Sequence, residues 1–266
     1  MVQIRRTLSY LILLGLSLTH AVAQVKPTEN TTGQKPILYQ PSILIEMFSS
    51  EGCSSCPVAD EFMGELIHMS DSVGLAVYVI DFHVDIWNRS GWVDPYSDSN
   101  YTKRQQTYLK KKSIQSTYTP MAFINGGDKD FAGSDKPGIG RTLHALINTP
   151  SQHFLRTAVG PVEGQDSMQL TYQAWGNIDS CDLRVAFIQK RINNMVMGGE
   201  NSGLVLHHHN IVRNFYTLPT DGKDKGTIKI GYNPDFNMEN FAVISYLQHQ
   251  RTWKVLAADR ITFTTK

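Results

Sequence analysis

The chain has 266 residues, of which 41% are hydrophobic and 18% are charged, and its formal net charge is +1 at pH 7. This composition is typical of a globular protein with one large domain or two ordinary ones. The near-zero net charge argues against a nucleic-acid partner.

The first 23 residues have the pattern of a secretory signal peptide. Arg5 and Arg6 form a basic start, residues 8–18 form an apolar stretch too short to span a bilayer, and residues 21–23 (Ala-Val-Ala) resemble a cleavage site. We therefore expect a periplasmic or secreted protein with no stable membrane insertion after cleavage; an uncleaved anchor is the alternative. Residues 24–39 are polar and contain two prolines, which predicts a flexible N-terminal segment.

The next segment predicts a strand, a helix and a second strand. The apolar run 43–48 is followed by Cys53-Ser-Ser-Cys56-Pro57, and a helical pattern continues to about Ser70. Residues 75–82 form a near-continuous apolar run, as in a strand buried on both faces. The helix between these strands implies a parallel β-α-β unit. Four helix residues are expected on its core face: Val58, Phe62, Leu66 and Met69.

Four further elements are predicted before residue 150. After a polar and aromatic loop, 83–98, the pattern predicts a helix over 99–112 and a strand over 121–124. A tight turn at 125–127 and a short strand at 130–132 complete a hairpin, and a last helix begins near residue 136. The predicted order is β-α-β-α-β-β-α in a mixed sheet.

From Thr149-Pro150 onward, alternation of apolar and polar residues replaces the helical period. Alternating runs occur at 170–174, 183–187, 228–232, 241–247 and 253–257. Six or seven strands at this spacing predict an immunoglobulin-like β-sandwich. We therefore expect two domains, 40–150 and 151–266.

Residues 40–150 resemble a thioredoxin fold in the order of their elements, in the Cys-x-x-Cys motif and in the Thr119-Pro120 pair before the third strand. Several motifs further resemble a family of bacterial secreted thioredoxin-like proteins catalogued as a domain of unknown function. These are Glu46-Met-Phe-Ser-Ser-Glu-Gly-Cys-Ser-Ser-Cys-Pro, Phe82-His-Val-Asp-Ile-Trp, Gly91-Trp-Val-Asp-Pro, Tyr118-Thr-Pro-Met, Gly199-Glu-Asn-Ser-Gly and Asn210-Ile-Val-Arg.

The thioredoxin resemblance implies specific roles for two residues. Pro120 is expected to be cis and to lie against the cysteines, and the backbone of Thr119 is expected to pair with bound substrate. The residues between the cysteines tune the redox potential in this superfamily. Here they are Ser54-Ser55, which leaves the direction of electron flow open.

The dithiol is the predicted catalytic centre. A helix N-terminus stabilises a thiolate, so Cys53 is expected to be the nucleophile and Cys56 the resolving cysteine. The alternative is a static structural disulfide. The odd cysteine, Cys181, is interpreted as a half-buried small residue, with intermolecular pairing as the alternative.

Four polar or aromatic residues complete the predicted site. Glu46 lies in an apolar strand and is expected to accept the proton of Cys56; an edge-facing or salt-bridged Glu46 is the alternative. His83, Asp85 and Trp87 follow the second strand at the sheet edge where the cysteines lie, which predicts substrate contacts. Alternatively, their loop packs on itself.

These observations predict an exported thiol-disulfide oxidoreductase with no cofactor other than its redox-active disulfide. Its expected partners are protein thiol or disulfide clients and an unknown redox partner. Two alternatives use the same residues: a copper(I)-binding chaperone with His83 as an added ligand, or a binding module without catalysis. Residues 207–209 are three histidines. On a strand the outer two would share a face and the middle one would point away, so no three-ligand site is expected and all three are interpreted as surface residues.

Overall fold

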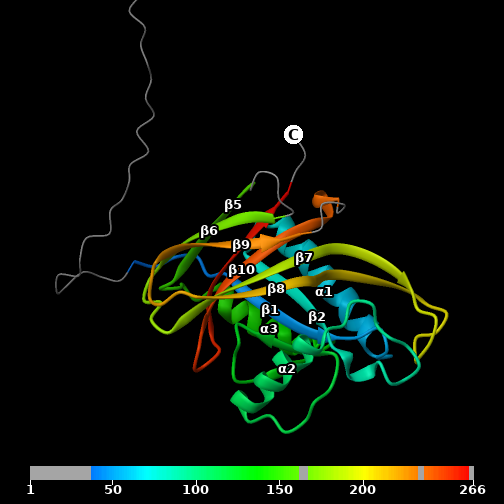
Figure 1. Cartoon of the computed structure of the whole chain (residues 1–266). Coiled ribbons are helices and arrows are strands. Elements are labelled where there is room, and N and C mark those ends of the chain that lie inside the picture. Colours follow the sequence, from blue (N-terminus) through cyan, green and yellow to red (C-terminus); the bar gives the residue numbers. More distant parts are fainter. Residues whose placement is uncertain (1–36, 162–166, 233–236, 264–266) are drawn as a thin grey trace, which may run out of the picture. The chain divides into compact units, whose positions relative to one another are not determined.

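Two β-sheets organise the part of the chain described by the computed structural model, residues 37–161, 167–232 and 237–263. The large sheet is mixed and has eight strands in the order β11-β10-β7-β8-β2-β1-β3-β4 (Figure 1). The small sheet is antiparallel and has the order β5-β6-β9. The described chain is therefore a mixed α/β protein. The predicted signal peptide and most of the predicted flexible segment lie outside these residues.

The first seven major elements follow the predicted order β-α-β-α-β-β-α. They are β1 (Ile43–Ser49), α1 (Cys56–Ser72), β2 (Val77–His83), α2 (Ser99–Lys112), β3 (Met121–Ile124), β4 (Asp130–Ala132) and α3 (Lys136–Ile147). Strand β1 is parallel to β2 and antiparallel to β3, and β4 is antiparallel to β3. A short 3-10 helix, Asp85–Trp87, lies in the loop after β2.

The remaining elements are almost entirely strands. They are β5 (Phe154–Pro161), β6 (Ser167–Trp175), β7 (Cys181–Met195), β8 (Val205–Pro219), β9 (Lys225–Gly231), β10 (Phe241–His249) and β11 (Val255–Thr262), with a 3-10 helix at Met238–Asn240. Strand β8 continues the large sheet beside β2, through the pair Asp81 and Ile211. Strands from both sides of residue 150 thus share one sheet, and the proposed domain boundary marks a change of sequence pattern within that sheet.

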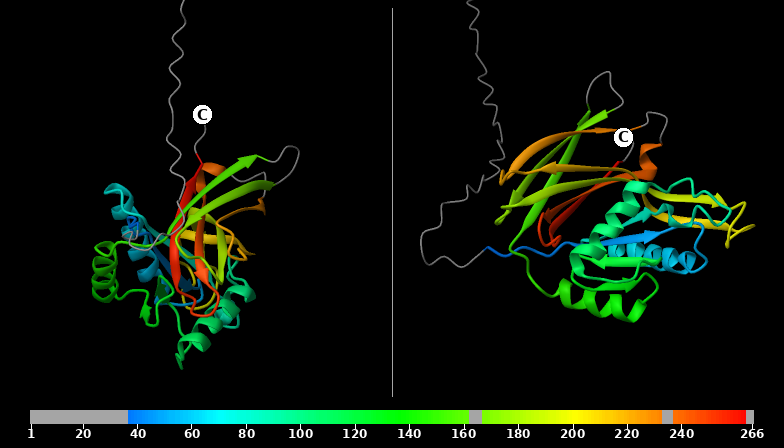
Figure 2. Two further views of the ribbon diagram at one scale, coloured as in Figure 1. Left: turned by 90° about the vertical axis from the view of Figure 1, so that its left-hand side faces the viewer. Right: turned by 60° about the horizontal axis from the view of Figure 1, so that its bottom comes forward.

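Alternation along β1 sends its side chains into two different cores. Ile45 and Met47 pack with α1 and α3, whereas Leu44 and Phe48 pack with α2 on the other face. Figure 2 shows these helices on the two faces of the large sheet. A third core fills the space between the small sheet and the β7-β10-β11 region.

The buried face of α1 is shifted from the predicted one. Phe62 and Leu66 are buried as expected, but Val58 and Met69 are 62% and 54% exposed. Ala59 lies on the buried face instead, one residue further along the helix. The sequence-based prediction placed the larger side chains of Val58 and Met69 in the core, whereas the small side chain of Ala59 is buried there and allows close packing.

Glu46 lies on the face of β1 opposite to α1 and forms a buried ion pair there. Its Oε2 accepts a hydrogen bond from Arg104 Nε at 2.7 Å, and its other oxygen accepts one from the Tyr108 hydroxyl. Arg104 also donates to Tyr246 and Gln248. Burial acts to lower the pKa of Arg104, but the Glu46 carboxylate outweighs it and raises that pKa, so the guanidinium is charged.

The alternation of β1 thus corrects the predicted position of Glu46. Its immediate neighbour Met47 faces α1, and a shift of one residue along a strand moves a side chain to the other face. Glu46 is therefore salt-bridged, as the alternative prediction stated. The carboxyl groups near the cysteines at the start of α1 belong to other residues.

We expect Arg104→Met to lower the free energy of unfolding by about 3–5 kcal/mol, because it leaves the Glu46 charge buried without its partner. Urea unfolding measures this loss. Lys136→Met is the control, since it breaks the exposed pair with Glu65 and should cost at most about 1 kcal/mol. Equal losses in the two variants would contradict a stabilising role for the buried pair.

Candidate functional site

The disulfide between Cys53 and Cys56 lies where β1 leads into α1. Helix α1 begins at Cys56, with Ser55 at its N-cap position. The two cysteines are 2% and 4% exposed, while Ser54 and Ser55 between them are exposed. The strand-to-helix placement of the motif is therefore as predicted, and the sulfur atoms sit beneath the surface of the loop.

Thr119, Pro120 and Trp87 meet the disulfide from two other loops. The Thr119-Pro120 peptide bond is cis, as the thioredoxin resemblance implied. The Sγ of Cys53 lies 3.6 Å from the Thr119 carbonyl oxygen, and Trp87 Nε1 donates to Thr119 Oγ1 at 2.7 Å. A Cβ at Gly52 would lie only 2.8 Å from the Cβ of Trp87, so any larger residue at position 52 would clash with Trp87.

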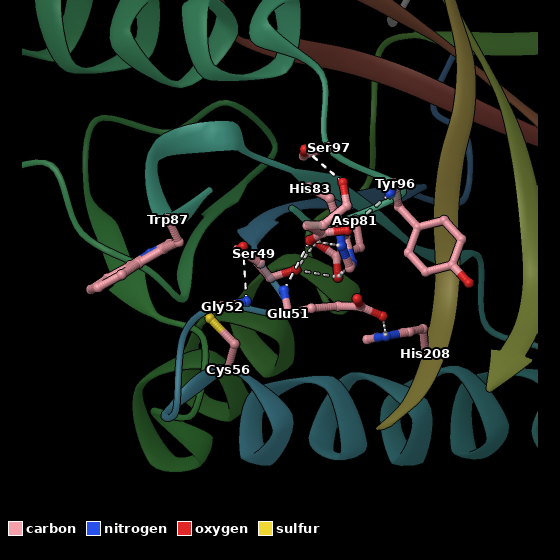
Figure 3. A network of polar contacts seen from close by, with 12 residues as sticks. Ser49, Glu51, Gly52, Cys56, Asp81, His83, Trp87, Tyr96, Ser97 and His208 are labelled. Carbon is pink, nitrogen blue, oxygen red and sulfur yellow. Dashed lines mark hydrogen bonds and ion pairs between the residues drawn. The ribbon is translucent and has the colours of Figure 1, made fainter. Parts of the chain in front are cut away.

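A buried polar network lies next to the disulfide (Figure 3). His83 Nδ1 is 2.7 Å from Asp94 Oδ2, and its Nε2 is 3.5 Å from Asp81 Oδ2. Ser49 Oγ donates to the Asp81 carboxylate at 2.7 Å, and Asp94 also accepts the backbone N–H of Glu51 at 2.9 Å. His83, predicted as a substrate contact, is thus an interior residue, 1% exposed.

A second histidine joins this network from β8. His208 Nδ1 is 2.6 Å from Asp60 Oδ2, and its Nε2 is 3.0 Å from Glu51 Oε1. Glu51 also accepts hydrogen bonds from Trp92 Nε1 and from Asn194 Nδ2. The network therefore connects β1, β2 and α1 to the long hairpin of β7 and β8.

The burial of His208 corrects the prediction of three surface histidines. The middle histidine does point away from its neighbours, but its face of β8 packs on α1, leaving His208 4% exposed. His207 is exposed, as expected, whereas His209 is half-buried with its ring against Gly64 of α1. Strand alternation separates His208 from its two neighbours, but only the packing of β8 beside α1 decided which of the three are buried.

Cys56 and the network border one small cavity of about 10 Å³. The polar residues that line it with Cys56 include Ser49, Asp60, His83 and His208. Cys56 therefore faces hydroxyl, carboxylate and imidazole groups. These are groups that accept and pass protons.

Burial and charge pairing shift the acidities in this network. Burial alone would lower the pKa of His83, but Asp94 and Asp81 raise it well above 6.5. Burial raises the pKa of Asp81, against the opposing effect of His83. For Asp94 the balance is reversed: burial acts upward, but His83 and two backbone N–H groups lower its pKa. His83 is therefore a charged imidazole beside two carboxyl groups: that of Asp94 is a stronger acid than usual, and that of Asp81 is a weaker one.

Two predicted residues lie outside this arrangement. Asp85 accepts a hydrogen bond from Thr102 Oγ1 at 2.5 Å, so it ties the loop after β2 to helix α2. Cys181 is a free thiol, 1% exposed, in the core between the sheets. Burial, together with nearby Asp182 and Asp179, raises its pKa to about 11, which makes it a poor nucleophile.

The loop between β7 and β8, residues 196–204, covers the Cys-x-x-Cys turn. The buried side chain of Asn201 donates to the carbonyl oxygens of Glu51 and Cys53 at 2.8 and 3.0 Å. Glu200 accepts the backbone N–H of Ser54 at 2.9 Å. Figure 1 shows this hairpin, in yellow, reaching past the large sheet toward that turn. Gly199-Glu-Asn-Ser-Gly stood out in the sequence as a motif, but nothing in it indicated this contact.

Fold and site together define a mixed α/β protein with a buried Cys-x-x-Cys disulfide beside a cis-proline and a histidine-carboxylate network. The family model described as "Protein of unknown function (DUF1223)" matches residues 44–248. The chain belongs to this family. The match includes most of β1, the disulfide, both histidines of the network and most of β10.

Two solved structures resemble the chain to different degrees. A protein from Agrobacterium tumefaciens, from the Northeast Structural Genomics Consortium, has a TM-score of 0.64 and 22% sequence identity, covering 86% of this chain and 97% of that one. A domain of the outer membrane lipoprotein Omp28 from Porphyromonas gingivalis has a TM-score of 0.26 and 10% identity, covering 42% and 94%. No curated protein matches. The first similarity shows that the fold is shared.

The network predicts a specific pH dependence of stability. Burial opposes charge on His208, but Asp60 and Glu51 outweigh it and raise its pKa above 6.5, even with charged His83 nearby and Tyr96 against its ring. The stabilisation is therefore complete below about pH 6.5 and is lost as the pH rises through the folded-state pKa.

We expect His208→Gln to destabilise the protein more at about pH 6 than at about pH 9, by urea unfolding. His207→Gln, at the exposed neighbouring position, is the matched control and should cost little at either pH. A His208→Gln loss that does not change with pH would show that the histidine is held there in its neutral form.

Proposed function

We propose that the protein is an exported thiol-disulfide oxidoreductase that acts on protein clients through Cys53 and Cys56. One observation carries the proposal: the disulfide lies between the end of β1 and the start of α1, with Cys53 Sγ 3.6 Å from the carbonyl oxygen that precedes cis-Pro120. A static disulfide would not need a backbone carbonyl and a polar network at its two sulfur atoms.

The same proposal interprets residues 40–150 as a thioredoxin-like domain and residues 151–266 as an immunoglobulin-like sandwich. The element order, the parallel pair β1 and β2, and the antiparallel strands β3 and β4 support the first part. The core between the small sheet and β7, β10 and β11 supports the second.

The proposed chemistry is thiol-disulfide exchange in two steps. For a client disulfide, the Cys53 thiolate attacks one client sulfur, the client S–S bond breaks, and the other client sulfur leaves as a thiolate. The Cys56 thiolate then attacks Cys53 Sγ, which releases the second client thiolate and restores the Cys53–Cys56 disulfide. Two electrons pass from the protein to the client. The reverse sequence oxidises a client dithiol, and the redox partner sets the net direction.

Asp81 is the proposed proton acceptor for Cys56 in the second step. The Ser49 hydroxyl lines the same cavity as Cys56 and donates to Asp81. Because burial raises the pKa of Asp81, its carboxylate is a stronger base than an exposed one. Asp81 pairs in register with Met47 on the α1 side of the sheet, so it holds the position that the sequence had suggested for Glu46.

Access to the disulfide requires movement of the β7–β8 loop in this proposal. Both cysteines are nearly buried, and Glu200 occupies the backbone N–H of Ser54. Glu200 is itself exposed, so that contact can open without unfolding the core. A client strand that binds along Thr119 would replace Glu200 at the turn.

The proposed export rests on the signal-peptide pattern of residues 1–23. These residues lie outside the described part of the chain. Among residues 37–161, 167–232 and 237–263, no helix is long and apolar enough to cross a membrane. In the periplasm or outside the cell, a dithiol can be kept oxidised, as in this structure.

Copper(I) binding remains the second hypothesis for the same cysteines. His83 pairs through Nδ1 with Asp94 and lies with Nε2 3.5 Å from Asp81, so metal binding at Nε2 would require the loss of its proton. Within the described part of the chain, no group of three or more His, Cys, Asp or Glu side chains is arranged to hold a metal ion. Metal analysis of the reduced protein after incubation with copper(I) tests this alternative.

Trapping of mixed disulfides tests the proposed activity. Cys56→Ser removes the resolving thiol, so client proteins should accumulate as disulfides with Cys53 on non-reducing gels of cells that express the variant. Cys53→Ser is the matched control, because it retains Cys56 and Cys181 but lacks the nucleophile. Trapping of the same proteins by both variants, or of none by Cys56→Ser, would contradict the proposed role of Cys53.

A second experiment tests the proton acceptor. In Asp81→Asn, release of glutathione from a Cys53–glutathione mixed disulfide should be about 100-fold slower, because Cys56 loses its base. Rapid acid quenching and mass spectrometry measure this rate. Asp71→Asn at the exposed end of α1 is the control and should keep the original rate. Equal rates in all three proteins would exclude Asp81 from the proton transfer.

A further inference from the structure

A second polar pocket lies on the α2 side of the large sheet, away from the face that α1 covers. It has a volume of about 540 Å³ and lies between α2, the strands β7 and β8, and Trp253. Its lining includes three arginines, Arg104, Arg184 and Arg213, and four aromatic side chains. The proposed redox chemistry uses none of these residues.

The guanidinium groups in this pocket lie close to shared aromatic rings. Arg104 Cζ is 4.8 Å from the ring centre of Phe215 and 4.9 Å from that of Trp253. Arg184 Cζ is 5.9 Å from the same Trp253 ring. The positive charges of Arg104 and Arg184 therefore both lie close to the indole ring of Trp253. Burial and then the charge of Arg104 lower the pKa of Arg184, which reflects this crowding.

The carboxylates nearby do not satisfy all the donors of the pocket. Glu46 pairs with Arg104 below it, and Asp182 is 3.1 Å from an Arg184 terminal nitrogen. Arg184 Nε is nevertheless buried without a hydrogen-bond partner in the described part of the chain. Among the lining residues the one acid is Asp98, whose carboxylate caps α2 by accepting the Asn100 N–H at 2.7 Å.

We propose that this pocket binds an oxyanion, a carboxylate or a phosphate, carried on a flat apolar body. An oxyanion would relieve the repulsion between Arg104 and Arg184 and would offer an acceptor to Arg184 Nε. Guanidinium groups hold carboxylates and phosphates through paired hydrogen bonds, and the aromatic rings provide contact for a planar group. The volume is within the range of small-molecule sites.

Calorimetric titration of the full chain with phenyl phosphate and with benzoate tests this site. We expect at least one of them to bind, and Arg184→Met to weaken that binding at least tenfold while keeping the aliphatic volume of the side chain. Arg156→Met is the control, because it removes the same charge from an exposed position on β5. It should leave the affinity unchanged.

The two aryl anions separate the carboxylate from the phosphate form of the ligand. Inorganic phosphate and benzyl alcohol test whether charge or ring alone is sufficient, and each should bind at least tenfold more weakly than the better aryl anion. Arg213→Met serves as a second pocket variant if Arg184→Met does not fold. The proposal is wrong if neither aryl anion binds at millimolar concentration, or if the control variant loses as much affinity as the pocket variants. Client trapping by Cys56→Ser does not depend on these outcomes.

Discussion

The two-sided burial of β1 is the constraint on which the rest of the structure depends. All seven of its residues are buried, so each side chain must fit the size and polarity of the core that it faces. The odd-numbered residues Ile43, Ile45 and Met47 support α1, which begins at the disulfide. Glu46 faces the other layer, where a charge is tolerated only with a partner, and Arg104 provides it. One strand thereby organises two chemically different regions.

The polar network beside the disulfide shows how a charged group is kept inside such a protein. Two imidazoles are placed among four carboxyl groups from four different segments, and Ser49, Trp92 and backbone N–H groups complete the hydrogen bonding. Buried charges are costly unless they are paired and hydrogen-bonded. Apolar side chains would bury a purely structural disulfide at a lower cost in free energy than this polar network does. The presence of the network therefore supports a role of its residues in proton transfer.

The long hairpin of β7 and β8 links the two predicted halves of the chain. It pairs with β2 inside the large sheet, contributes His208 to the network and covers the Cys-x-x-Cys turn with Asn201. Strands from the second half of the chain therefore build part of the environment of a disulfide in the first half. The hydrogen bonds of the β7–β8 loop to the backbone of Glu51, Cys53 and Ser54 hold the turn in its buried position.

The sequence alone determined the elements up to α3 and the pattern of later strands, because these depend on local periodicity and turn residues. The cis-proline beside Cys53 and Cys56 was implied by the resemblance to the thioredoxin fold. The sequence pattern located five of the seven later strands but neither β5 nor β8, whose alternation is weak or interrupted by polar residues. Only the tertiary structure decided which face of a strand or helix is buried. That choice moved Glu46 away from α1, brought His208 and Asp81 toward Cys56 and gathered three arginines in one pocket. It depends on contacts between segments far apart in the chain, from 32 residues for Ser49 and Asp81 to 157 residues for Glu51 and His208.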